Sequence, residues 1–165
     1  MIVVDTNFLV LLLDPDSTQN EHREAERVRF FIDRLSSSKE EVMIAAPSLA
    51  ELVAGRVDRV EEIVEAVRRS RVLSIQPFDQ VIAIETGERI ALARARVSER
   101  DKVPGWKVAM KYDAMIAATA IVRGATAIYT TDYGLDKYLE GSGVEICYVK
   151  NLPLPPEDPQ HTLAL

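Results

Sequence analysis

The chain has 165 residues, of which 47% are hydrophobic and 28% are charged, and its formal net charge is −6. This composition is typical of one globular domain and excludes a chain that is disordered throughout. The acidic balance argues against a protein that coats nucleic acid by bulk electrostatic attraction, but it permits a nuclease whose acidic residues surround metal ions.

Apolar runs and turn residues predict strands and helices that alternate along the chain. In chain order we predict a strand over 2–4, a helix over about 8–13, a helix from 17 or 18 to about 35, a strand over 42–46, a helix opening at Ser48, a helix over about 57–70, a strand over 72–75, a helix from Asp79 to about 98, a buried helix over 112–122, a strand over 125–130, a short helix over about 135–139 and a strand over 144–149. Strands that alternate with helices predict a three-layer α/β/α domain with a mostly parallel central sheet. We expect this domain to span residues 1–150 and a proline-rich tail to occupy residues 151–165.

The single cysteine and the N-terminal sequence indicate the cellular compartment. Cys147 has no partner for an internal disulfide or for a CxxC zinc site, and its apolar surroundings predict a buried strand residue. The first residues lack the basic segment of a signal peptide, and the apolar stretches fall far short of the ~20 residues that span a membrane. We therefore expect a soluble cytoplasmic protein without membrane contact.

Three carboxylates follow predicted strands, and a fourth begins the buried helix. Asp5, Glu51 and Asp132 come at or soon after the ends of the strands over 2–4, 42–46 and 125–130, and Asp113 starts the apolar helix. In an open α/β sheet, ligands bind beyond the carboxyl ends of the strands. Converging carboxylates repel one another unless cations neutralise them, and Mg²⁺ and Mn²⁺ prefer such oxygen ligands. These ions can also generate a hydroxide nucleophile and stabilise an in-line phosphoryl displacement, so the cluster favours metal-dependent phosphoryl chemistry.

Each acid also has a purely structural interpretation. Asp5 or Thr6 would cap the following helix, and Ser48 with Glu51 has the spacing of a capping box. Asp113 at a helix start would be favoured by the helix dipole. Thr131 or Asp132 would cap the short helix predicted over about 135–139.

Four sequence segments together resemble the PIN domain family, and most closely its VapC-type toxin ribonucleases. They are residues 3–7 (VVDTN), 48–51 (SLAE), 112–120 (YDAMIAATA) and 130–132 (TTD), and the resemblance covers about residues 1–150. It implies Mg²⁺- or Mn²⁺-dependent cleavage of RNA. By the same resemblance, the catalytic and metal-binding residues would be Asp5, Glu51, Asp113 and Asp132, the supporting residues would be Thr6, Asn7 and Thr130, and Asp136 would be a substitute for Asp132. It also implies a homodimer that a partner antitoxin silences.

The segment from Glu88 to Lys111 has seven basic and three acidic residues, a local net charge of +4. We hypothesise contacts to RNA phosphates from Arg89, Arg96, Arg100, Lys107 and Lys111. The alternative is a solvated helix face whose arginines pair with Glu85, Glu88 and Glu99. Trp106 would stack on a base or, as we favour, pack at the edge of a core or subunit.

Other functions remain open at this point. An aspartyl phosphatase of the haloacid dehalogenase type would need a second acid where this chain has Asn7. A PIN-like RNA-processing enzyme, a DNA-cleaving flap-type nuclease and a non-catalytic PIN-like interaction module share the same acids.

Overall fold

The computed structural model describes residues 1–38, 40–95 and 104–156, and its centre is a five-stranded parallel sheet. The strands are β1 (Ile2–Val4), β2 (Val42–Ala45), β3 (Leu73–Gln76), β4 (Ala127–Thr130) and β5 (Glu145–Tyr148), in the order β3-β2-β1-β4-β5. In the register, Val3 lies between Met43 on β2 and Ile128 on β4. The parallel sheet confirms the predicted fold class, and it brings the carboxyl ends of all five strands to one edge.

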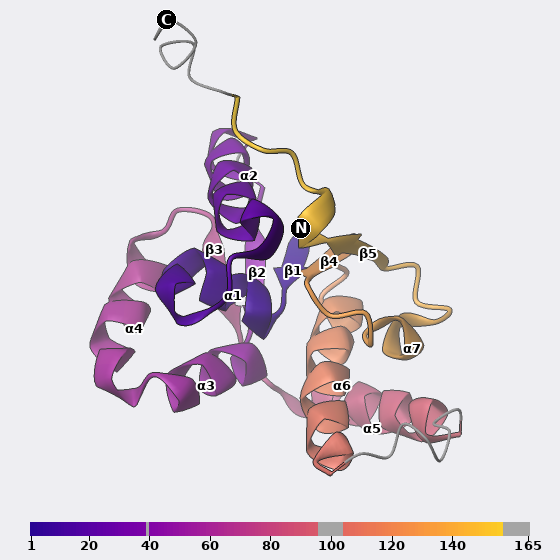
Figure 1. The fold of residues 1–165 in the computed structure, drawn as a ribbon. Helices are drawn as coiled ribbons and strands as arrows, with labels where there is room; N and C mark the ends of the chain where they lie inside the picture. The colour runs from indigo at the N-terminus through magenta and orange to yellow at the C-terminus, as the bar shows by residue number, and fades with distance from the viewer. Residues whose placement is uncertain (39, 96–103, 157–165) are drawn as a thin grey trace, which may run out of the picture.

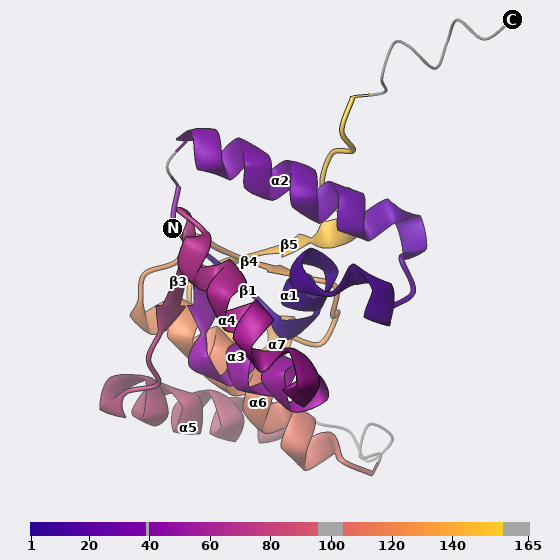
Figure 2. The ribbon, with the colours of Figure 1, turned by 90° about the vertical axis from the view of Figure 1, so that its left-hand side faces the viewer.

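Helices cover both faces of the sheet, so the three predicted layers are present (Figure 1). One face carries α1 (Thr6–Leu13), α2 (Glu24–Ser38), α3 (Ala46–Gly55) and α4 (Val60–Arg69), and the other carries α5 (Gln80–Arg94), α6 (Trp106–Val122) and α7 (Asp136–Leu139). Figure 2 shows α2 on one side of the strands and α5 with α6 on the opposite side. Short 3₁₀ turns complete the connections at Pro15–Ser17, Glu21–Arg23, Val57–Arg59 and Val149–Asn151.

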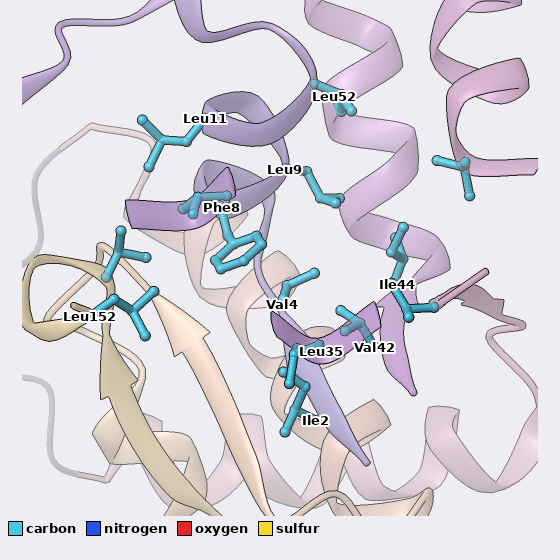
Figure 3. Close-up of a cluster of buried hydrophobic side chains, with 14 of the residues drawn as sticks. Ile2, Val4, Phe8, Leu9, Leu11, Leu35, Val42, Ile44, Leu52 and Leu152 are labelled. Atoms are coloured by element: carbon cyan, nitrogen blue, oxygen red, sulfur yellow. The ribbon is translucent and has the colours of Figure 1, made fainter. Parts of the chain in front are cut away.

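Alternating side chains of β1 pack into two separate hydrophobic cores, one on each face of the sheet. Ile2 and Val4 point to the face covered by α1, and Val3 points to the face covered by α6. In the first core, Phe8 is fully buried among aliphatic side chains (Figure 3), and its ring meets those of Phe31 and Tyr129 edge-on. Burying an aromatic side chain of this kind contributes roughly 1.5–3 kcal/mol, so α1 is fixed firmly where β1 ends.

The second core is built on the small side chains of α6. Ala114, Ala117, Ala118 and Ala120 are fully buried, and these short side chains let the helix axis approach the sheet closely. Helix α5 packs along the outside of α6. The buried helix predicted over 112–122 is therefore confirmed, but it begins six residues earlier, at Trp106.

Several local predictions are refined by the structure. The helix expected from 17 or 18 begins at Glu24, because His22 and Arg23 adopt left-handed backbone angles just before it. The predicted end of the helix from Asp79, near 98, lies outside the described residues. Leu152, in the predicted tail, is buried in the first core, and Cys147 is a half-buried residue of β5. In the described part of the chain, no helix is both long and apolar enough to cross a membrane.

Candidate active site

The four predicted acids line one pocket at the carboxyl edge of the sheet. The pocket has a volume of about 350 Å³, and its walls come from the residues that follow β1 and β4, from α3 and from α6. The lining residues are Asp5, Thr6, Asn7, Glu51, Tyr112, Asp113, Ile116, Asp132 and Leu135. Acids up to 127 positions apart in the sequence, from Asp5 to Asp132, meet here because parallel strands end at one edge.

Asp5 is the most deeply buried of the four acids, with 4% of its surface exposed. One carboxylate oxygen, Oδ1, accepts the backbone N–H of Phe8 at 2.7 Å, and the other accepts the hydroxyl of Thr130. The helix-cap interpretation is therefore correct for Asp5, which caps α1 while it faces the pocket. Burial nevertheless raises the pKa of Asp5 to about 6, because these two hydrogen bonds offset only part of the lost hydration.

Glu51 lies on the exposed side of the pocket, in the second turn of α3. Its Oε2 accepts a 2.6 Å hydrogen bond from the hydroxyl of Thr6. The capping-box interpretation is wrong, because α3 begins at Ala46 with Pro47 in its first turn, and its cap residue makes no side-chain hydrogen bond. Glu51 is thus held toward the pocket by a residue that follows β1.

Asp113 is half-buried and lies two turns inside α6, so the helix-start interpretation is wrong. Burial and the negative charge of Asp132 raise the pKa of Asp113 to about 7. The charge of Lys137 on α7 works in the opposite direction, and the charges of Glu51 and Asp5 raise the pKa further. The pocket is therefore a place where adding one more negative charge is costly.

Asp132 is exposed and sits in the turn after β4. Its backbone N–H donates to the hydroxyl of Thr130 at 2.8 Å, and its Oδ1 accepts the N–H of Gly134 at 2.8 Å. The predicted capping of the short helix is wrong, because Leu135 precedes α7 and makes no side-chain cap. The Thr130 hydroxyl thus joins two of the acids, since it donates to Asp5 and accepts from the Asp132 backbone. Asp136 lies outside this pocket and lines a separate hollow beside α7.

The chemistry of the pocket fits a divalent cation. Its donors are carboxylate, hydroxyl and amide oxygens, which Mg²⁺ and Mn²⁺ prefer. The raised pKa values of Asp5 and Asp113 show that ionised carboxylates are unfavourable in this desolvated pocket. A bound cation would offset their negative charge. As the side chains stand, the described residues contain no group of three acidic, histidine or cysteine side chains that is close enough to hold one ion.

The predicted basic residues are distributed unevenly. Arg89 is mostly buried, and it pairs with Glu85 at 2.6 Å and donates to the carbonyl of Glu140. Lys107 and Lys111 are exposed on α6, in the turns that lead to Asp113. Arg96 and Arg100 lie outside the described residues. Trp106 packs against the second core, as the packing interpretation expects.

The family model of the PIN domain matches residues 2–140. This chain belongs to the PIN domain family. Solved structures with the same fold include FitAB bound to an IR36 DNA fragment, with a TM-score of 0.62 and 23% identity over 93% of this chain and 98% of that one. Rickettsia felis VapBC2 bound to a promoter DNA fragment gives a TM-score of 0.60 and 17% identity, over 90% of this chain and 98% of that one. Mycobacterium tuberculosis VapC20, a sarcin-ricin loop cleaving toxin, gives a TM-score of 0.55 and 20% identity, over 82% of this chain and 93% of that one. At these identities the likeness concerns the fold, and curated protein sequences give no significant match.

The PIN domain pocket also contains residues that the sequence did not single out. Tyr112, Ile116 and Leu135 line it, and Lys137 is close enough to lower the pKa of Asp113. Spacing along α6 would have identified Ile116, which lies one turn after Tyr112 and three residues after Asp113. Lys137 carries no comparable signal, because its proximity depends on how α7 packs against α6.

Proposed function

We propose that this PIN domain is a metal-dependent endoribonuclease that hydrolyses RNA phosphodiester bonds. The observation that carries the proposal is the single pocket lined by Asp5, Glu51, Asp113 and Asp132, in which burial and mutual repulsion raise two of the carboxylate pKa values. Family membership supports the reaction class, because nuclease activity is typical of PIN domains.

The four acids would hold Mg²⁺ or Mn²⁺, directly or through water. A bound ion supplies a nucleophilic hydroxide at neutral pH and neutralises charge that builds up on the phosphate. Thr6 orients Glu51, and Thr130 orients both Asp5 and the turn that carries Asp132. Asn7 lines the pocket and would position water or substrate.

The lysines of α6 would contribute to RNA binding. Lys107 and Lys111 are exposed, and each lies within seven residues of Asp113 on the same helix. Their positive charges would attract the RNA backbone to an otherwise acidic protein. Arg96 and Arg100 remain part of this proposal from sequence alone, whereas Arg89 is already engaged by Glu85 and Glu140.

We further propose that the protein is the toxin of a toxin–antitoxin pair, is silenced by a partner antitoxin and acts in the cytoplasm as a homodimer. The shared fold with FitAB, VapBC2 and VapC20 supports this setting. Exposed apolar side chains on α5, namely Val81, Ile84 and Leu92, offer surface for a protein contact. Light scattering of the purified protein would give its oligomeric state, and a monomer at micromolar concentration would contradict the homodimer.

The test of the proposed reaction is cleavage of a labelled single-stranded RNA and a structured RNA by the purified protein. Parallel reactions contain Mg²⁺, Mn²⁺ or EDTA. Asp5→Asn is the variant at the pocket, and Asp136→Asn is the matched control, because Asp136 is exposed and lies outside the pocket.

We expect cleavage only with a divalent cation, with loss of activity in Asp5→Asn and normal activity in Asp136→Asn. Cleavage that persists in EDTA, or that is equal in Asp5→Asn and the wild type, would contradict the proposal. A folded protein that cleaves neither RNA under any condition would favour the non-catalytic interaction module.

A further inference from the structure

Two tyrosines and a lysine form an exposed aromatic surface beside the carboxylate pocket. The ring of Tyr133 stacks on that of Tyr148, with 4.7 Å between centroids and 30° between planes. The Nζ of Lys150 lies 4.9 Å from the centroid of the Tyr133 ring. Despite these contacts, 60% of the surface of Tyr133 is exposed. We call these three residues the tyrosine platform.

The strand register joins the platform to the pocket. Tyr148 is the last residue of β5, and its register partner on β4 is Thr130, whose hydroxyl binds Asp5. Tyr133 directly follows Asp132, and the backbone N–H of Gly134 donates to Asp132 Oδ1 and so fixes the turn that contains both residues. The platform is therefore built at the same edge of the sheet as the acids, on the side of β4 and β5.

Packing of the domain does not explain the exposed ring of Tyr133. Trp106, by contrast, packs against the second core, and Tyr138 is completely buried. A large, mostly exposed aromatic residue next to a pocket, steadied by a second ring, is the arrangement on which unpaired bases stack in single-stranded nucleic-acid sites. Lys150 is exposed, and a hydrogen bond with Tyr133 raises its pKa further, so its side chain offers a positive charge for contact with a phosphate.

We propose that the tyrosine platform binds a base of single-stranded RNA next to the phosphodiester that is cleaved, with Lys150 contacting a flanking phosphate. This inference rests on the proposed function, because it assumes that RNA enters the carboxylate pocket. Stacking tolerates any base, so the platform selects unpaired RNA over duplex rather than a particular sequence. It would therefore direct cleavage to loops and single strands.

The test measures RNA binding rather than cleavage. All proteins carry Asp113→Asn, so that the RNA stays intact, and the probe is a fluorescently labelled single-stranded decanucleotide in Mg²⁺. The variants are Tyr133→Ala, Tyr133→Phe and Lys150→Gln. Phe78→Ala is the matched control, because Phe78 is 38% exposed and follows β3, the outer strand on the side of the sheet away from β4 and β5.

We expect Tyr133→Ala to raise the Kd about tenfold, which is in the range of losing one stacked base. Tyr133→Phe keeps the ring and should stay within about twofold, as should Phe78→Ala. Lys150→Gln should weaken binding and reduce the dependence of log Kd on log salt by about one ion. Binding of a blunt RNA duplex should be the same with and without Tyr133→Ala.

A Kd unchanged in Tyr133→Ala, an equal loss in Phe78→Ala, or no measurable RNA binding at all would overturn the platform. An unchanged Kd would assign the exposed tyrosine to a protein contact instead. Equal melting temperatures of the variants exclude unfolding as the cause of a loss. If Tyr133 supports RNA binding but the wild type cleaves no RNA, the proposed reaction fails, and only the base-binding role of the platform stands, without its place beside a cleaved phosphodiester. If the wild type cleaves RNA and Tyr133→Ala leaves the Kd for RNA unchanged, the proposed reaction stands and the platform proposal fails.

Discussion

Replacing Asp113 by asparagine should stabilise the metal-free protein while it removes a carboxylate from the pocket. Burial and neighbouring negative charges raise the pKa of Asp113 from 3.8 to about 7, so the folded protein binds this proton more tightly than the unfolded chain does. The free energy of unfolding of the wild type therefore falls as the pH rises from about 4 to about 7. Asparagine has nearly the same shape and never ionises, so the variant avoids that loss.

The size of the effect follows from the pKa. A rise from 3.8 to about 7 corresponds to roughly 4 kcal/mol at about 1.4 kcal/mol for each pKa unit. Because Asp113 is only half-buried, solvent screening reduces this, and we expect about 2–4 kcal/mol at pH 8. For a domain of this size that is a melting temperature higher by roughly 4–16 °C. At pH 3.5 the two proteins should be nearly equal in stability.

Urea unfolding followed by circular dichroism, in EDTA at pH 3.5, 5.5 and 8, measures this difference. Asp136→Asn is the control and should change the free energy of unfolding by less than about 0.5 kcal/mol at every pH, because Asp136 is exposed. The reasoning is refuted if Asp113→Asn is no more stable than the wild type at pH 8. It is also refuted if the gain in stability is the same at pH 3.5.

Three further predictions concern other parts of the site and its support. Asp14 is buried at the end of α1, where hydrogen bonding to Arg56 lowers its pKa to about 2. Asp14→Asn should lower the free energy of unfolding in urea by about 2–4 kcal/mol at pH 7, and this difference should disappear as the pH falls toward 2. Ser48 is fully buried, and its hydroxyl has no partner among the described residues, so Ser48→Ala should raise the melting temperature or leave it unchanged, and a loss above about 1 kcal/mol would contradict this. Thr6→Val frees Glu51 from its 2.6 Å hydrogen bond, so the Mg²⁺ concentration for half-maximal cleavage should rise about tenfold or more; an unchanged Mg²⁺ dependence would show that Thr6 does not position Glu51.

The sequence was sufficient to predict the sheet and the acids at its edge. Short β-branched runs such as residues 2–4 mark buried strands, and the first polar residue after such a run lies at a strand end by necessity. The parallel topology then gathers Asp5, Glu51 and Asp132 without any knowledge of loop structure. Asp113 joins them because α6 packs across the sheet beneath Val3.

Local helix boundaries were harder to predict. Ser48 and Glu51 have capping-box spacing, but Pro47 lacks an N–H and has a helical φ, so it suits the first turn of a helix. The helix therefore starts at Ala46, two residues before Ser48. Helix α6 starts at Trp106, after the left-handed Gly105, although its first turns expose Lys107 and look like loop sequence. In both helices, tertiary packing decides the boundary.

The tyrosine platform has no sequence signature. Tyr133 and Tyr148 are fifteen residues apart, and only the pairing of β4 with β5 brings their rings together. Exposed aromatic residues also follow no periodicity, because no buried face selects them. Such a surface can be found only after the register is known.

The most direct test of a cation-binding carboxylate pocket is a calorimetric titration of Mn²⁺ at pH 6.5, in two buffers that differ in ionisation enthalpy. With pKa values of about 6 and about 7, Asp5 and Asp113 together carry about one proton at this pH, and a bound cation displaces it. We predict binding that releases about one proton per ion, that is lost or much weakened in Asp113→Asn and that is unchanged in Asp136→Asn. Absence of Mn²⁺ binding, or binding that releases no proton and survives in Asp113→Asn, would contradict a metal site in this pocket.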